Sequence, residues 1–138
     1  MKNIVKPVSF LFLIIFLLGG CAHYSTDFKA LIGTNVRDLE KARADGKKKT
    51  FPIPCDTAFD KVTAILENKG LTIFQTNRKK GYIIAMGFPK QTDTTRVGIF
   101  FEALPEGGTK ITLSSLSSTA LAKAVTLVFG GLEDETGH

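Results

Sequence analysis

Residues 56–88 read DTAFDKVTAILENKGLTIFQTNRKKGYIIAMGF, and this stretch decides the fold. Its first half repeats apolar residues at helical spacing, which predicts a helix over Thr57–Lys69 with Asp56 as its N-cap. Gly70 follows at the position where a residue of left-handed conformation commonly ends a helix. The stretch therefore begins with a well-marked amphipathic helix.

The second half of the stretch predicts a β-hairpin, because two β-branched and aromatic segments flank a polar turn at residues 77–81. Alternating segments before and after this stretch extend the sheet. The predicted strands are residues 50–53, 71–76, 82–88, 95–103 and 110–116. Pro52 and Pro54 confine the first of them to a sheet edge. Consecutive hairpins make the predicted sheet largely antiparallel.

The chain after the last strand predicts a second helix, from Thr119 to about Phe129, with Ser117 or Ser118 as its cap and Gly130-Gly131 as its end. The sequence thus predicts an α+β fold in one domain, residues 48–132. It has an antiparallel sheet of about five strands, one long helix after the first strand and an apolar C-terminal helix. Residues 133–138 are expected to form an acidic, soluble tail.

The N-terminus has the composition of an export signal. Lys2 and Lys6 precede an uncharged apolar run over residues 8–18, and Leu18-Gly19-Gly20-Cys21 follows. A transmembrane helix needs about 20 apolar residues, and this run is shorter. Residues 1–20 are therefore predicted to be a signal peptide.

Leu18-Gly19-Gly20-Cys21 resembles the lipobox of bacterial lipoproteins. The resemblance implies cleavage between Gly20 and Cys21, and it implies that the Cys21 thiol carries diacylglycerol and becomes the lipidated N-terminus. Ala22 stands where an aspartate would favour retention in the inner membrane. The resemblance therefore implies the outer membrane, on its periplasmic face, rather than the inner membrane.

Residues 21–47 are predicted to be a tether with a possible short helix from Thr34 to about Gly46. Six cations lie in and after this helix: Arg37, Lys41, Arg43, Lys47, Lys48 and Lys49. They form either a basic patch for anionic headgroups or a solvated face diluted by neighbouring acids. Without the signal, 16 basic and 13 acidic residues leave a net charge of only +3, and no nucleic-acid partner is expected.

Residues for chemistry are sparse. If Cys21 is lipidated, Cys55 is left without a disulfide partner, as either a reactive thiol or a half-buried residue beside a helix start. The two histidines, His23 and His138, are far apart in the sequence and cannot complete a zinc site or a catalytic set. No enzymatic activity, metal or cofactor is predicted.

The pattern Phe59-x₂-Val62-x₃-Leu66-x₃-Gly70-Leu71-x-Ile73, followed by Arg78-x₂-Gly81-Tyr82-Ile83, resembles the repeated domain of the BamC (NlpB) family of outer-membrane assembly lipoproteins. The similarity covers roughly residues 51–104. It implies a helix-grip-like fold, in which a long helix is held across an antiparallel sheet. The matching residues are core and turn positions, so no binding residue is implied.

The sequence therefore predicts a lipid-anchored, non-enzymatic module that binds an envelope protein or another envelope component. Its predicted contact surface combines Arg78, Lys79 and Lys80 of the hairpin turn with Leu127 and Phe129 of the last helix. An alternative is a module that binds an apolar or lipidic molecule between sheet and helix. In that alternative, four phenylalanines would line the cavity or simply form the core: Phe74, Phe88, Phe100 and Phe101.

Overall fold

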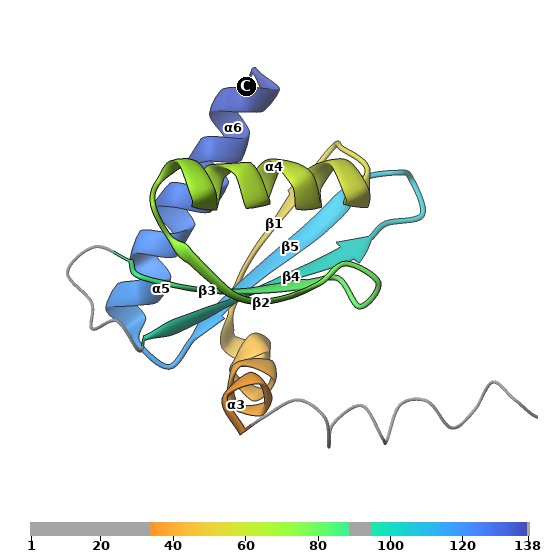
Figure 1. Cartoon of the computed structure of the whole chain (residues 1–138). Coiled ribbons are helices and arrows are strands. Elements are labelled where there is room, and N and C mark those ends of the chain that lie inside the picture. Colours follow the sequence, from red (N-terminus) through yellow and green to blue (C-terminus); the bar gives the residue numbers. More distant parts are fainter. Residues whose placement is uncertain (1–33, 89–94, 138) are drawn as a thin grey trace, which may run out of the picture. The chain divides into compact units, whose positions relative to one another are not determined.

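A five-stranded antiparallel sheet organises residues 34–88 and 95–137, which a computed structural model describes (Figure 1). The strands are β1 (Lys47–Phe51), β2 (Thr72–Asn77), β3 (Tyr82–Met86), β4 (Arg96–Ala103) and β5 (Thr109–Ser115), in the spatial order β1-β5-β4-β3-β2. The predicted α+β class and the antiparallel sheet are confirmed. β1 is an edge strand and ends before Pro52, which has no N–H to donate to a ladder.

The helices are α3 (Thr34–Ala42), the 3-10 turn η1 (Arg43–Asp45), α4 (Cys55–Asn68), α5 (Ser118–Ala124), the π-helical segment η2 (Val125–Phe129) and α6 (Gly130–Thr136). At 14 residues α4 is of ordinary length, so the expectation of one long helix is not met. Helical residues are instead divided between α3, α4 and the continuous segment 118–136. Within the described ranges, none of the helices is both long and apolar enough to cross a bilayer.

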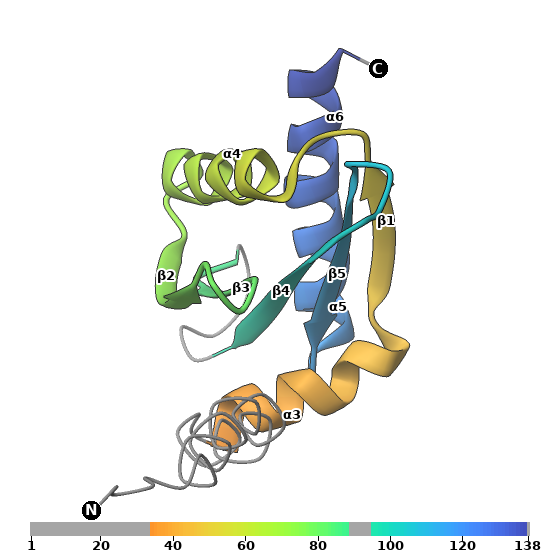
Figure 2. The same ribbon diagram turned by 90° about the vertical axis from the view of Figure 1, so that its right-hand side faces the viewer.

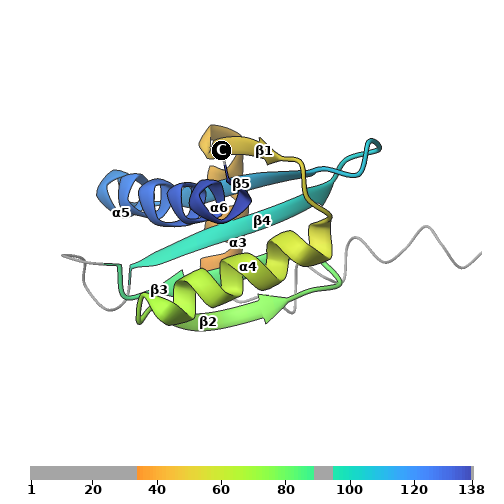
Figure 3. The ribbon, with the colours of Figure 1, turned by 90° about the horizontal axis from the view of Figure 1, so that it is seen from above.

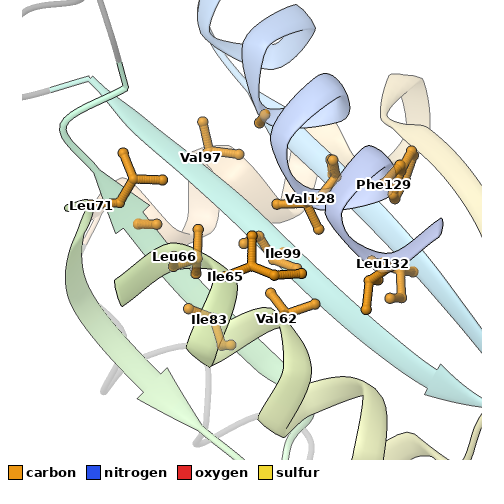
Figure 4. Close-up of a cluster of buried hydrophobic side chains, with 14 of the residues drawn as sticks. Val62, Ile65, Leu66, Leu71, Ile83, Val97, Ile99, Val128, Phe129 and Leu132 are labelled. Atoms are coloured by element: carbon orange, nitrogen blue, oxygen red, sulfur yellow. The ribbon is translucent and has the colours of Figure 1, made fainter. Parts of the chain in front are cut away.

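The helices form layers on the two faces of the sheet. α4 and the segment 118–136 lie side by side over one face, and α3 lies against the opposite face (Figures 2 and 3). The main core fills the space between the sheet and the layer formed by α4 and the segment 118–136. Figure 4 shows its centre, where residues of α4, β3, β4 and the C-terminal helix interlock: Val62, Ile65, Leu66, Leu71, Ile83, Val97, Ile99, Val128, Phe129 and Leu132.

A smaller buried layer lies beneath α3. Val36 and Leu39 of α3 are buried, as are Tyr82, Ile84 and Phe100, which share this face of the sheet. The Ser114 hydroxyl donates a hydrogen bond of 2.8 Å to the carbonyl of Leu39. The predicted short helix is therefore confirmed, but the predicted domain start at residue 48 is wrong, because the compact unit begins at Thr34. The segment expected to be part of a tether covers one face of the sheet.

The ends of α4 follow from local chemistry. Pro54, rather than the predicted Asp56, is the N-cap, and its carbonyl accepts the Ala58 N–H at 2.9 Å. Asp56 lies in the first turn, where a carboxylate favours the helix dipole. The predicted C-terminal signal is confirmed, since Gly70 has φ 71° and the Leu71 N–H reaches the Leu66 carbonyl at 2.9 Å.

The C-terminal helix is capped at Ser117, whose hydroxyl accepts the Ala120 N–H at 3.2 Å. The prediction that Gly130-Gly131 ends this helix is wrong, because the helix continues to Thr136. Gly131 serves close packing instead: a β-carbon there would lie 2.9 Å from Ile65 Cδ1 of α4. Because glycine has no β-carbon, α6 can approach α4 closely, and Leu132 is buried.

The acidic residues at the end of the chain are also part of the fold. Glu133 forms an ion pair with Lys49 of β1, and Glu135 forms one of 2.8 Å with Lys61 of α4. The expected soluble tail over residues 133–138 is therefore wrong for residues 133–136, which belong to α6. His138 lies outside the described residues.

Candidate functional site

A groove of about 600 Å³ runs between the end of α4 and the C-terminal helix. Its lining residues are Ile65, Asn68, Lys69, Thr126, Leu127, Gly130, Gly131, Asp134 and Glu135. Gly130 borders open space, because a β-carbon there would meet no atom within 4 Å, whereas Gly131 packs closely against Ile65. Ile65 and Leu127 contribute apolar surface, while Lys69 and the two carboxylates supply charges of both signs.

A second hollow, of about 440 Å³, lies on the outer side of the same helix. It is lined by Thr119, Ala122, Lys123, Thr126 and Leu127. Thr126 and Leu127 line both hollows, so these two residues join them into one surface. Of these two residues, Leu127 has the larger side chain and the apolar one, and it is half-buried where the hollows meet.

Phe129, predicted to share a contact surface with Leu127, belongs instead to the core. It is 6% exposed, and its ring centroid lies 5.8 Å from that of Phe51 in β1. Side chains two residues apart in an α-helix point in directions about 200° apart. In the π-helical segment η2, Leu127 and Phe129 likewise lie on different sides of the helix. The prediction that Phe129 contacts a partner is therefore wrong, and helical spacing alone argues against pairing it with Leu127.

The hairpin turn, where Arg78, Lys79 and Lys80 are exposed, meets the other end of α4. The Arg78 guanidinium pairs with Asp60 and, at 3.4 Å, with Asp56, and its Cζ lies 4.5 Å from the centre of the Phe59 ring. The hydrogen bond with Asp60 raises the pKa of Arg78.

The predicted five-residue surface is therefore not one surface. The hairpin turn contacts the first turns of α4, whereas Leu127 lies beside its last turns. Arg78 is engaged by carboxylates of its own chain. No sequence signal predicted these pairs, because they join residues 18 and 22 positions apart.

On the α3 side, a polar pocket of about 330 Å³ is lined by Glu40, Arg43, Ala44, Lys48, Glu102, Lys110 and Thr112. Glu102 pairs with Lys110 at 2.8 Å and with Arg43 at 3.9 Å. The hydrogen bond from Lys110 lowers the pKa of Glu102. Arg43 also lies 3.4 Å from the neighbouring Glu40, whereas Lys49 pairs with the distant Glu133. The two interpretations of the six cations, a basic patch or a diluted face, both stay predictions.

Cys55 is half-buried at the start of α4, which confirms its predicted position beside a helix start. Burial and the neighbouring Asp56 carboxylate raise the pKa of its thiol, while hydrogen bonding with Thr109 opposes them. A raised pKa reduces the fraction of reactive thiolate. In residues 34–88 and 95–137, no group of three or more histidine, cysteine, aspartate or glutamate side chains is arranged to hold a metal ion.

The four phenylalanines of the ligand-binding alternative lie in three different environments. Phe74 is 47% exposed, Phe88 and Phe101 belong to the main core, and Phe100 is buried on the face covered by α3. Phe101 packs against Phe59 of α4, with ring centroids 5.1 Å apart. These four side chains therefore do not line a common cavity.

No protein-family model matches the sequence, and no curated protein matches it. The predicted signal peptide, residues 1–20, and the predicted lipidation site at Cys21 lie outside the described residues. The function is therefore inferred from this chain's own sequence and surfaces.

Proposed function

We propose that this chain is an envelope lipoprotein, anchored in the outer membrane by lipid on Cys21, with a non-enzymatic, periplasm-facing domain that binds an envelope protein or other envelope component. The observation that carries the anchor is the order of charged start, apolar run and Leu18-Gly19-Gly20-Cys21. Two or three acyl chains hold a protein at a membrane far more firmly than one. We include in this proposal the helix-grip-like arrangement and the relation to BamC-like envelope lipoproteins.

The surface proposed for partner binding is the pair of hollows that meet at Leu127. They combine apolar floor residues with a charged rim, which is the usual composition of a protein contact site. The hollows lie on helices that pack into the main core and are therefore held in place. Little conformational entropy is then lost when a partner binds. The hairpin turn is a weaker candidate, since Asp56 and Asp60 already engage Arg78.

The anchor is tested by metabolic labelling with an alkyne analogue of palmitate. The wild-type chain and Cys55→Ser are expected to incorporate the label, whereas Cys21→Ser is expected to lose it, because each variant keeps one of the two cysteines. Density-gradient separation should place the labelled protein in the outer-membrane fraction, and Ala22→Asp should move it to the inner membrane. Label retained by Cys21→Ser would show that the anchor is wrongly assigned.

The binding surface is tested by affinity purification of the tagged, membrane-inserted chain. Leu127→Asp is expected to lower partner recovery about tenfold or more, because an apolar anchor at an interface commonly contributes over 1.4 kcal/mol. Glu106→Lys, at an exposed position in the turn between β4 and β5 that lines neither hollow, serves as the surface control and should leave recovery unchanged. Equal recovery with both variants, or no protein enriched over Cys21→Ser, contradicts a binding role for this surface.

A further inference from the structure

Two large apolar side chains are exposed within the described residues, Leu116 at 76% and Phe74 at 47%. Both lie at the same end of the sheet. Leu116 follows β5, beside the start of β4, since Val97 pairs with Ser115. Arg96 begins β4, and its guanidinium carbon lies 3.8 Å from the centre of the Phe74 ring. One cation thus stands between two exposed apolar groups.

The turn that carries Leu116 is held in place by hydrogen bonds. The Ser115 hydroxyl donates to the Arg96 carbonyl at 2.8 Å, and the Ser117 N–H donates to the Ser115 oxygen at 3.2 Å. These bonds tie both neighbours of Leu116 to the sheet. The exposed side chain is therefore presented by a fixed backbone, which lowers the entropy lost when it inserts into an apolar phase.

Basic residues surround this end of the molecule. α3, the start of β1 and the end of β5 lie together there (Figures 1 and 2), and Lys47 pairs with Leu113 in the ladder. Lys41 and Lys47 are exposed. Residues 34–49 contain six cations and three carboxylates, and two of the cations, Arg43 and Lys49, also pair with Glu102 and Glu133 elsewhere in the chain. Exposed apolar side chains with basic residues near them are favoured at the interface of a bilayer that contains anionic lipid.

The same end is the one nearest the proposed anchor along the chain. Residues 22–33 separate Cys21 from the first residue of α3, a span of at most about 45 Å if fully extended. A short tether of this kind keeps a surface at an effective concentration in the millimolar range. A contact made by two apolar side chains and a few cations is therefore sufficient to orient the domain.

We propose that the end of the sheet carrying Leu116, Phe74 and Arg96 rests on the surface of the bilayer, with Leu116 inserted among the anionic headgroups. This inference relies on the lipid anchor proposed for Cys21. It fixes the orientation of the domain, because the turn between β4 and β5, at the opposite end of the sheet, then points away from the membrane. The surface around Leu127, where the two hollows meet, lies beyond the C-terminal end of α5 and remains available to a partner.

The chain contains no tryptophan, so a single substitution introduces a unique fluorescent probe. The full lipidated chain carrying Leu116→Trp is reconstituted in vesicles of phosphatidylethanolamine and phosphatidylglycerol, with and without brominated acyl chains. We expect a blue-shifted emission and at least about twofold quenching by the brominated lipid. Glu106→Trp, in the turn between β4 and β5, is the matched control and should not be quenched.

Vesicle flotation separates this inference from the anchor. A lipidated chain that does not float with vesicles contradicts the anchor itself. A chain that floats but shows equal quenching at positions 116 and 106, or none at either, contradicts only the orientation. Protection of the probe that appears only when envelope proteins are added would identify a protein as the occupant and would likewise overturn the inference. Replacing phosphatidylglycerol by phosphatidylcholine should weaken the quenching, because the cations lose their counter-charge.

Discussion

Phe129→Ala is expected to lower the free energy of unfolding by about 3–5 kcal/mol, the range for truncating a buried aromatic side chain. The ring is 6% exposed and packs against Phe51 of the edge strand β1. Its removal leaves a cavity between the C-terminal helix and the sheet, which are both held by the main core. The loss therefore includes both the transfer free energy of the ring and the cost of the cavity.

Leu127→Ala is the matched control, because it truncates a half-buried side chain two residues earlier in the same π-helical segment. It should cost about 1 kcal/mol or less, since solvent already reaches part of the side chain. Urea unfolding followed by far-ultraviolet circular dichroism gives both values, with unchanged slopes as the sign of comparable states. Similar midpoints for the two variants would contradict the assignment of Phe129 to the core.

The second large effect is expected at the turn between β2 and β3. Gly81→Ala should destabilise the fold by about 2–4 kcal/mol, from left-handed strain and from steric overlap together. Gly81 has φ 68°, and a β-carbon there would lie 2.6 Å from the carbonyl oxygen of Phe101. The Gly81 carbonyl also accepts the Phe101 N–H at 2.8 Å, so the two backbones cannot separate without losing that bond.

Gly107→Ala, in the turn between β4 and β5, isolates the strain. Its φ is 91°, but a β-carbon there would meet no atom within 4 Å. The cost should therefore be only about 1–2 kcal/mol, which is the conformational part alone. Thermal unfolding of the two variants under one buffer condition provides the comparison. If Gly107→Ala proved as damaging as Gly81→Ala, close approach to Phe101 would not be the reason for glycine at position 81.

Local signals in the sequence predicted the parts of the fold that depend on neighbouring residues. Gly70 ends α4 and Ser117 caps α5 as expected, because each acts within one helical turn. The end of the C-terminal helix was mispredicted, since a glycine pair usually breaks a helix when solvent surrounds it. Here Gly131 faces Ile65, and that contact joins residues 66 positions apart, beyond the range of any local pattern.

The candidate site was predictable only in part. Leu127 is half-buried and lines both hollows, while its contact with a partner stays a prediction. The groove itself depends on how α6 sits beside α4, and the ion pairs of Glu133 with Lys49 and of Glu135 with Lys61 help to set that placement. These pairs join residues 84 and 74 positions apart, so no reading of local spacing could place them.

The lipid anchor proposed for Cys21 gives the two edges of the sheet a particular importance, because it would confine the protein to a surface. In two dimensions, anchored copies meet far more often than the same number of molecules free in solution, and an open strand edge then invites lateral polymerisation. β1 presents three consecutive lysines at one edge, and β2 breaks its register between Ile73 and Gln75 at the other. Like charge on one side and an irregular ladder on the other oppose the joining of sheets between neighbouring copies, which the proposed lipid anchor would bring close together on a membrane.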